Sequence, residues 1–326
     1  MGGDSGPTVT VPAVKRFLAN NPNMEVTLHG REAELSAALA RHFSDAGADI
    51  SRRYQVVFSP EVVSDDEPPA SALRNKQGSS LWRSLQQVAE DGAGACVSAG
   101  NTGALMAMGI RLLGLAGGVE RPAICAALPR DQGRFYLLDV GANVDCSARQ
   151  LHQFANMATT LVSLVENTDR PSCGLLNIGQ EATKGNRLVK EASALLANDP
   201  RLNYHGFVEA HQFFTSAVKI VVSDGFSGNI ALKATEGAAR FVLDHLYSRL
   251  ESLSGDGSLA AQNNTALELD PRRYNGAVLL GLKKIVIKSH GSADESGFYG
   301  ALETAARSAT NAVAEGVSRY FEELTQ

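Results

Sequence analysis

The stretch FYLLDVGANVD, residues 135–145, shows the pattern that decides the fold. An apolar run ends in a short loop rich in Gly, Asn and Asp, and a helix-like segment follows. The same succession recurs at residues 98–103, 177–181 and 223–229. A strand that enters a helix through glycines points backbone N–H groups and the positive end of the helix at one spot, which favours an anion. Four such loops predict the rim of an active site.

Strands and helices alternate along the rest of the chain. Short apolar runs bounded by Gly or Pro predict strands at residues 25–29, 54–58, 95–98, 123–128, 135–140, 174–178, 218–223 and 284–287. Helices are predicted at residues 31–43, 80–91, 102–113, 148–166, 184–197, 228–253 and 298–324. This alternation is typical of a mostly parallel sheet covered on both faces, in which ligands bind at the carboxyl ends of the strands.

Composition limits the class of protein. The 326 residues are 44% hydrophobic and 20% charged, with a net charge of -5, which is typical of a soluble globular protein and argues against a general nucleic-acid binder. Cys96, Cys125, Cys146 and Cys173 lack C-x-x-C spacing and are expected to be small buried side chains in a reducing compartment. No stretch approaches the roughly 20 apolar residues of a membrane-spanning helix. The sequence therefore predicts a cytoplasmic protein.

Two segments depart from the alternation. Residues 254–270 are polar and contain Gly255 and Gly257, which predicts a surface connection within one domain covering residues 1–326. Residues 1–7, MGGDSGP, look like a loop that should follow a strand, yet no strand precedes them. The expected sheet therefore lacks its first strand.

The loops, taken in order, resemble the phosphate acyltransferase family, known as PlsX or acyl-ACP:phosphate acyltransferase. The matching stretches are collinear and lie at residues 1–7, 98–106, 138–146, 175–185, 223–233 and 274–291. The resemblance implies a Rossmann-like α/β/α fold similar to isocitrate dehydrogenases and phosphotransacetylases. It also implies transfer of a fatty acyl group from acyl carrier protein to inorganic phosphate. A homodimer without a cofactor is expected, whose acyl phosphate serves phospholipid synthesis through a membrane glycerol-3-phosphate acyltransferase.

The resemblance suggests an explanation for both segments that depart from the alternation of strands and helices. Family members carry a strand ahead of the first loop, so the true start of the chain is expected upstream of Met1. They also place an amphipathic segment before the motif at residues 274–277, and are considered peripheral membrane proteins. Here residues 252–270 are polar, whereas an interfacial helix needs a broad apolar face, so at most weak membrane association is expected.

The implied chemistry asks little of a side-chain nucleophile. Phosphate is already anionic at neutral pH, so the site must hold it against the thioester carbonyl and stabilise the oxyanion. Asn143 is the preferred donor for this purpose, although Asn and Asp in such loops also serve as turn residues. Asn101, Thr102 and Gly103 are candidate phosphate contacts, with helix capping as the alternative role of Asn101 and Thr102.

Further candidates follow the third and fourth loops. Lys184 is predicted to open a helix, where a cation opposes the dipole, and a contact with phosphate would explain its place there. Asp224 is predicted to position a lysine or a water molecule, with an Asx turn as the alternative. Asn229 and Lys233 are predicted phosphate contacts one helical turn apart, although Lys233 also fits an ordinary surface lysine.

The first and last matching stretches add four residues. Gly3 and Asp4 would extend the rim, and Lys288 would contact phosphate. His290 is a candidate proton donor to the departing thiolate, although a histidine that bonds a neighbouring loop is an equal alternative. The remaining histidines show no metal-like spacing, so no metal site is predicted.

Three rival functions remain open. One is a phosphotransacetylase-like transfer from acyl-CoA to phosphate, which uses similar loops. Another is a weakly active scaffold of lipid-synthesis enzymes, motivated by the missing strand and the polar segment. A dehydrogenase is less well supported, because none of the glycine loops gives G-x-G-x-x-G followed by an acidic residue.

Overall fold

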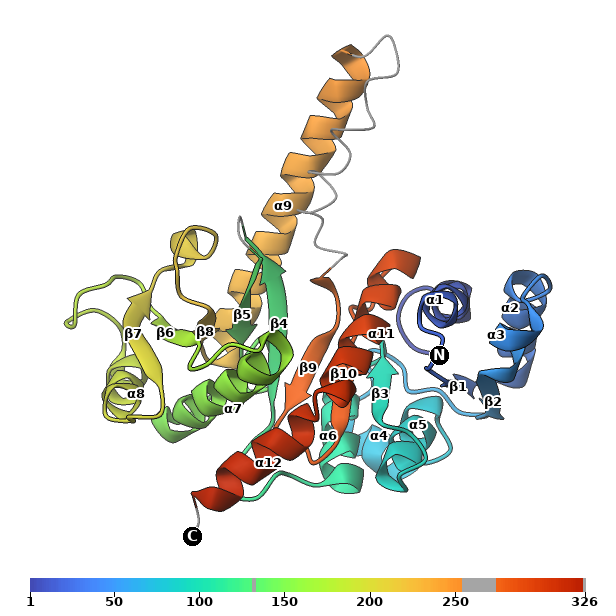
Figure 1. The fold of residues 1–326 in the computed structure, drawn as a ribbon, viewed down its shortest axis with the longest axis horizontal. Helices are drawn as coiled ribbons and strands as arrows, with labels where there is room; N and C mark the ends of the chain where they lie inside the picture. Colours follow the sequence, from blue (N-terminus) through green and yellow to red (C-terminus); the bar gives the residue numbers. More distant parts are fainter. Residues whose placement is uncertain (131–132, 254–273, 325–326) are drawn as a thin grey trace. The chain divides into compact units, whose positions relative to one another are not determined.

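The computed structural model describes residues 1–130, 133–253 and 274–324. Its alternating helices and mostly parallel strands confirm the predicted α/β class (Figure 1). The chain divides into two compact units, Met1–Pro122 with Asn275–Gln326 (unit 1) and Ala123–Tyr274 (unit 2). The single folding domain expected from the sequence stays a prediction, and the polar connection expected at residues 254–270 lies outside the described residues.

The described part of unit 1 contains five strands and eight helices. Its elements are α1 (Pro7–Asn20), β1 (Val26–Gly30), α2 (Glu32–His42), α3 (Ala48–Arg52), β2 (Tyr54–Phe58), α4 (Pro69–Asn75), α5 (Ser80–Ala89), β3 (Ala95–Ser98), α6 (Thr102–Leu113), β9 (Ala277–Leu280), β10 (Ile285–Lys288), α11 (Glu295–Thr310) and α12 (Val313–Glu323). Strands β1 and β2 pair in parallel, as do β3 and β10, whereas β9 runs antiparallel to β10.

Strands β1 and β3 belong to two separate sheets. A cavity of about 420 Å³ is lined by both strands and by Met1 and Gly2. Helix α5 packs against β1 and β3, and α11 packs against β3 and β10. Whether residues precede Met1 stays a prediction.

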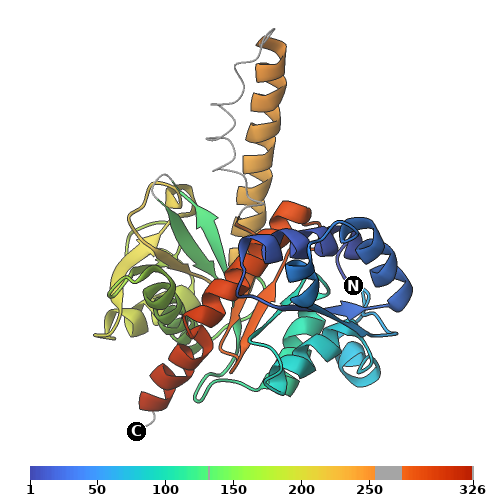
Figure 2. The ribbon, with the colours of Figure 1, turned by 45° about the vertical axis from the view of Figure 1, so that its right-hand side comes forward.

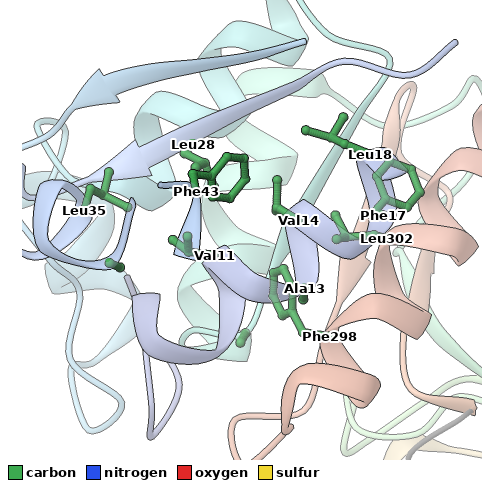
Figure 3. Packing of buried hydrophobic residues seen from close by; sticks show 12 residues of the cluster. Val11, Ala13, Val14, Phe17, Leu18, Leu28, Leu35, Phe43, Phe298 and Leu302 are labelled. Carbon is green, nitrogen blue, oxygen red and sulfur yellow. The ribbon is translucent and has the colours of Figure 1, made fainter. Parts of the chain in front are cut away.

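An apolar cluster beneath α1 forms the core on this side of unit 1. Val11, Val14 and Phe17 of α1 face Leu28 of β1 and Phe298 of α11 (Figure 3). All five side chains are buried. Because each such side chain contributes about 1.5–3 kcal/mol when removed from water, this cluster fixes α1 and the glycine loop that leads into it.

Unit 2 is a five-stranded sheet with three long helices. Its elements are β4 (Ala123–Pro129), β5 (Arg134–Leu138), α7 (Ala148–Glu166), β6 (Ser172–Leu176), α8 (Arg187–Ala197), β7 (Asn203–Val208), the 3-10 turn η1 (Ala210–Gln212), β8 (Ile220–Val222) and α9 (Gly225–Leu253). The strand order is β4-β5-β8-β6-β7, with β4 antiparallel to β5 and the other pairs parallel. The loops after β5, β8 and β6 therefore lie at one edge of this sheet.

Helices follow the first three glycine loops, as predicted, and begin at Thr102, Ala148 and Arg187. The fourth predicted loop, at residues 223–229, is mostly helical instead, because α9 already begins at Gly225. Helix α9 is 29 residues long, and its later turns extend away from the strands of its own unit (Figure 2). The helix predicted at residues 298–324 is instead two helices, because Ala312 adopts a left-handed conformation between α11 and α12. Among the described residues, no helix is long and apolar enough to cross a membrane.

Candidate functional site

The loop after β5 is organised around the Asp139 carboxylate. Its Oδ1 accepts hydrogen bonds from the backbone N–H groups of Ile124 (3.0 Å), Gly141 (3.2 Å) and Ala142 (3.0 Å). Its Oδ2 accepts from the Asn143 backbone N–H (2.7 Å) and from Asn143 Nδ2 (2.9 Å). The side chain is fully buried. Burial raises the pKa of Asp139, whereas these N–H donors oppose that shift and favour the ionised carboxylate.

This arrangement changes what the glycine loop can bind. The pattern of the sequence predicts that the backbone N–H groups of residues 141–143 face an external anion, whereas in the structure they point at the chain's own carboxylate. The loop therefore holds an internal anion. Asn143, the preferred donor, is buried, and its amide is oriented by Asp139.

The loop after β8 packs directly on the Asp139 loop. Gly225 donates its backbone N–H to the Asn143 carbonyl oxygen (2.8 Å), and Ser223 Oγ donates to the Asp139 carbonyl oxygen (3.2 Å). A Cβ atom at Gly228 would lie 2.0 Å from the same Asp139 oxygen. Only glycine fits at this contact, because no other residue lacks the Cβ.

Three predicted site residues lie in this segment. Asp224 accepts hydrogen bonds from the Ser227 backbone N–H (2.7 Å) and from Ser227 Oγ (3.0 Å), so its carboxylate caps the start of α9. Asn229 is half-buried, and a Cβ atom added to Gly141 would lie 3.7 Å from Asn229 Cγ. Lys233 is exposed one turn further along α9. The structure thus places the Asn229 side chain next to Gly141 of the Asp139 loop, and leaves Lys233 on the surface of α9.

Lys184 does not open a helix, contrary to the prediction. Helix α8 begins three residues later at Arg187, and Asn186 is its N-cap, accepting a hydrogen bond from the Val189 backbone N–H (2.9 Å). Lys184 is exposed in the preceding turn, where its backbone N–H donates to the Glu181 carbonyl oxygen (2.9 Å). The dipole of α8 therefore gives no reason to expect a phosphate contact at Lys184.

In unit 1, the first and last matching stretches meet. The Asp4 backbone N–H donates to the Gly291 carbonyl oxygen (2.9 Å). Gly3 has a positive φ of 75°, and a Cβ there would lie 2.8 Å from the same oxygen. A cavity of about 520 Å³ beside this loop is lined by residues 1–8 and by the cationic side chains Arg31 and Arg41.

Lys288 is the most buried of the three predicted site lysines, since Lys184 and Lys233 are exposed. Its Nζ donates to the carbonyl oxygens of Ala99 (3.0 Å) and Ser289 (2.5 Å). Burial lowers the pKa of Lys288 to about 8, although the carboxylates of Asp65 and Asp4 oppose this shift. A partly desolvated ammonium beside the glycine loops is well suited to contact an anion.

His290 is exposed, and its ring is held by the following turn. The Ser292 backbone N–H donates to Nδ1 (3.3 Å), and Ser292 Oγ lies 2.8 Å from the same atom. Because Nδ1 accepts, the neutral ring carries its proton on Nε2. The His290 backbone N–H donates to Asn275 Oδ1 (2.9 Å), and Asn275 Nδ2 donates to Ser289 Oγ (2.8 Å). Nε2–H is therefore the ring group of neutral His290 that can donate a hydrogen bond.

The Asn101 side chain caps helix α6. Its Oδ1 accepts from the Ala104 backbone N–H (2.9 Å), and its Nδ2 donates to the carbonyl oxygens of Ser64, Asp65 and Glu67 at 2.9–3.1 Å. Thr102 is the first residue of α6. A Cβ at Gly103 would lie 2.6 Å from Pro69 Cγ, so packing against α4 accounts for this glycine.

We expect Asn101 to contribute mainly to stability. Asn101→Ala should lower the free energy of unfolding by about 1–2 kcal/mol, because α6 loses its cap. Asn101→Asp is the matched control, since it keeps the capping oxygen and removes the three Nδ2 contacts. Thermal melts and the KM for phosphate of both variants test this expectation. A KM that rises far more than stability falls would instead assign Asn101 to phosphate.

Two residues of this site were missed in the sequence. Asp139 stands where an apolar strand ends in the loop at residues 139–145, and Asn275 lies in the last matching stretch. Their side chains contact loop backbone rather than solvent, and no sequence pattern gives the direction of such contacts. The available signal for Asp139 was a carboxylate at the end of an apolar run, shortly before Gly141 and Ala142.

The other nucleophiles and metal ligands form no further centre. Cys96, Cys125 and Cys173 are buried and Cys146 is half-buried, and all four are free. Burial raises the pKa of the Cys96 thiol to about 11 and that of Cys146 to about 12, so neither is a thiolate at neutral pH. The described ranges contain no group of three or more His, Cys, Asp or Glu side chains able to hold a metal ion.

Solved structures show the same fold. A phosphotransacetylase from Streptococcus pyogenes superposes with a TM-score of 0.59 at 17% identity, covering 93% of this chain and 91% of that one. A branched-chain phosphotransacylase from Enterococcus faecalis gives a TM-score of 0.53 at 14% identity, covering 88% of this chain and 99% of the other. At these identities the likeness concerns the fold alone.

Sequence comparison identifies the family. The model of a family described as "Fatty acid synthesis protein" matches residues 1–316. A phosphate acyltransferase of Legionella pneumophila is 45% identical over 320 residues, covering 97% of this chain and 92% of that protein. A phosphate acyltransferase of Janthinobacterium sp. is 44% identical over 333 residues, covering 99% and 91%. With identity at this level along nearly its whole length, the chain belongs to the phosphate acyltransferase family.

Proposed function

We propose that this enzyme transfers a fatty acyl group from acyl carrier protein to inorganic phosphate. The products are an acyl phosphate and the free thiol of the carrier protein. In this proposal Lys288 is the candidate contact of phosphate, and Asn143 is the candidate hydrogen-bond donor to the thioester carbonyl. His290 Nε2–H is the candidate donor to the departing thiolate. The names of the curated relatives support acyl transfer to phosphate.

The observation that favours a long acyl chain is a set of exposed apolar side chains at the carboxyl edge of the unit 2 sheet. Val144 is 62% exposed, Ile178 81%, Phe226 59% and Ile230 53%. Val144 and Ile230 directly follow Asn143 and Asn229, and Ile178 follows the buried Asn177. Apolar side chains gathered around a polar site are suited to a ligand with a hydrocarbon chain.

The choice of acyl donor tests this proposal. Phosphate-dependent thiol release should be measured with a long-chain acyl carrier protein, the matching acyl-CoA and acetyl-CoA. We expect the long-chain acyl carrier protein to give the highest kcat/KM. Exclusive use of acetyl-CoA would favour a phosphotransacetylase, and binding of the carrier protein without thiol release would favour a scaffold.

The apolar side chains should set the chain-length preference. Ile178→Ser should raise the KM for a long-chain donor roughly 5- to 10-fold, because an aliphatic side chain of this size contributes about 1–3 kcal/mol when buried. The KM for a short-chain donor should change little. Leu195→Ser, at another exposed apolar position in unit 2, is the matched control and should leave both values unchanged. An equal rise in the KM for the long-chain and the short-chain acyl donor would contradict a role of Ile178 in binding the acyl chain.

The cellular setting belongs to the same proposal. We expect a cytoplasmic homodimer, weakly associated with membranes at most, whose acyl phosphate is consumed by a membrane glycerol-3-phosphate acyltransferase in phospholipid synthesis. An acyl phosphate is reactive toward water, so prompt use by a second acyltransferase fits its chemistry.

A further inference from the structure

The turn after strand β10 is held by the side chain of Asn275, which lies in the same unit. Asn275 Oδ1 accepts a hydrogen bond from the His290 backbone N–H (2.9 Å), and Nδ2 donates to Ser289 Oγ (2.8 Å). Ser289 is fully buried and Asn275 is half-buried. A backbone N–H can only donate, so the first of these bonds fixes which amide atom of Asn275 is the oxygen. Both ends of the amide therefore hold the segment Ser289–His290.

The same segment holds the ammonium group of Lys288. Lys288 Nζ donates to the carbonyl oxygens of Ser289 (2.5 Å) and Ala99 (3.0 Å). The Ser289 carbonyl and the His290 N–H belong to one peptide unit, which is planar and trans, so they point in opposite directions. The bond from His290 N–H to Asn275 on one side therefore fixes the direction of the carbonyl that holds Lys288 on the other side.

The position of Asn275 follows from the pairing of β9 with β10. In this antiparallel register Ala277 lies opposite Lys288, which places Asn275 opposite His290. The backbone leaves the ladder at Gly276, whose φ is 109°. A side-chain carbonyl, rather than a backbone one, therefore accepts the His290 N–H. Asn275 thus continues the hold of β9 on β10 beyond the end of the strand.

We propose that Asn275 is a positioning residue of the phosphate site, which fixes the peptide unit that orients the Lys288 ammonium. An ammonium has three N–H donors, and within the described ranges two of those of Lys288 have acceptors. These two bonds fix the rotation of the ammonium, so its third N–H has one direction and can meet phosphate without reorganisation. This inference rests on the proposed function, because it assumes that Lys288 contacts phosphate.

A cycle of single and double variants separates positioning from a purely structural role. The proteins to compare are the wild type, Asn275→Ala, Lys288→Ala and the double variant, each assayed for kcat/KM for phosphate and for melting temperature. Asn311→Ala is the matched control. Asn311 is also half-buried in unit 1, and its Nδ2 donates to the Arg307 carbonyl oxygen (2.8 Å) at the C-terminal end of α11.

We expect Asn275→Ala to lower kcat/KM for phosphate about 10-fold in the wild type and less than about 2-fold in Lys288→Ala, because Asn275 acts through the lysine. Residues of one hydrogen-bond network couple to this extent. Asn311→Ala should lower the melting temperature and leave kcat/KM within about 2-fold of the wild type. A purely structural role of Asn275 predicts the same proportional loss of kcat/KM in both backgrounds. That result, or no loss in the wild type, would overturn the inference.

Ser289→Ala gives a second test if Asn275→Ala fails to fold. It removes the hydroxyl that accepts from Asn275 Nδ2 and keeps the bond between Asn275 and the His290 backbone. The loss of kcat/KM for phosphate should be about 3-fold in the wild type and absent in Lys288→Ala. Equal losses in both backgrounds, or none in the wild type, would overturn the positioning role. A wild-type enzyme that releases no thiol in the presence of phosphate from any acyl thioester would instead refute the proposed function.

Discussion

Gly228→Ala is expected to destabilise the protein by about 3 kcal/mol, toward the upper end of the range for overpacked interiors. The new Cβ would lie 2.0 Å from the Asp139 carbonyl oxygen and 2.4 Å from Ser223 Oγ. The backbone oxygen cannot rotate away, so α9 must shift from the Asp139 loop. Thermal melts should show a decrease of roughly 6 °C or more, together with loss of turnover.

Gly237→Ala is the matched control for this substitution. Gly237 lies in the same helix, is exposed, and has no heavy atom within 4 Å of the position of a new Cβ. Alanine should therefore stabilise α9 by up to about 1 kcal/mol, through helix propensity alone. If both variants melt alike, the close packing of α9 on the Asp139 loop is wrong.

Replacement of Lys288 should give the largest loss of phosphate binding. Lys288→Ala is expected to raise the KM for phosphate about 10- to 100-fold, because a charge-assisted hydrogen bond contributes about 1.5–3 kcal/mol. Lys288→Arg keeps the charge and should recover part of this loss. An unchanged KM in Lys288→Ala would remove this residue from the phosphate site.

The lowered pKa of Lys288 also predicts a dependence on pH. The kcat/KM for phosphate reports the free enzyme, so it should fall as the pH rises through about 8, where Lys288 loses its proton. Lys288→Arg should remain flat in this range, because a guanidinium stays charged above pH 12. A wild-type profile that is flat to pH 10 would contradict the assignment.

The lowered pKa of Lys288 also determines how the free energy of unfolding changes with pH. The pKa is about 8 in the folded state and 10.5 in the unfolded chain. Between these values the unfolded chain binds more protons, so stability should rise with pH over this window. In Lys288→Met this rise should disappear, which denaturant titrations at pH 7.5 and pH 9.5 would measure.

The fold class was predictable because most strands are apolar runs that end at glycine loops. The elements that were missed have weaker local signals. Helix α1 carries Pro12 in its interior and several β-branched residues, which disfavour a helix, yet burial against α2 and α11 stabilises it. Strand β7 contains Gly206 with a positive φ of 87°, and its pairing with β6 shifts register there.

The candidate site was predictable as a set of loops but not as contacts. Spacing placed Asn143 and Asn229 on neighbouring loops, and the structure brings their loops together. Spacing could not show that the N–H groups after Asp139 point inward, because that direction depends on the turn and on its packing. The expected helix start at Lys184 was wrong because Asn186, a strong N-cap residue, begins α8 later.

The most direct test of the central claim is detection of the acyl phosphate itself. The purified enzyme should be incubated with a long-chain acyl carrier protein and inorganic phosphate, and the mixture followed by phosphorus NMR. The account predicts an acyl phosphate resonance that grows in step with the free carrier thiol and requires all three components. Release of carrier thiol at the same rate without phosphate, yielding free fatty acid, would contradict it.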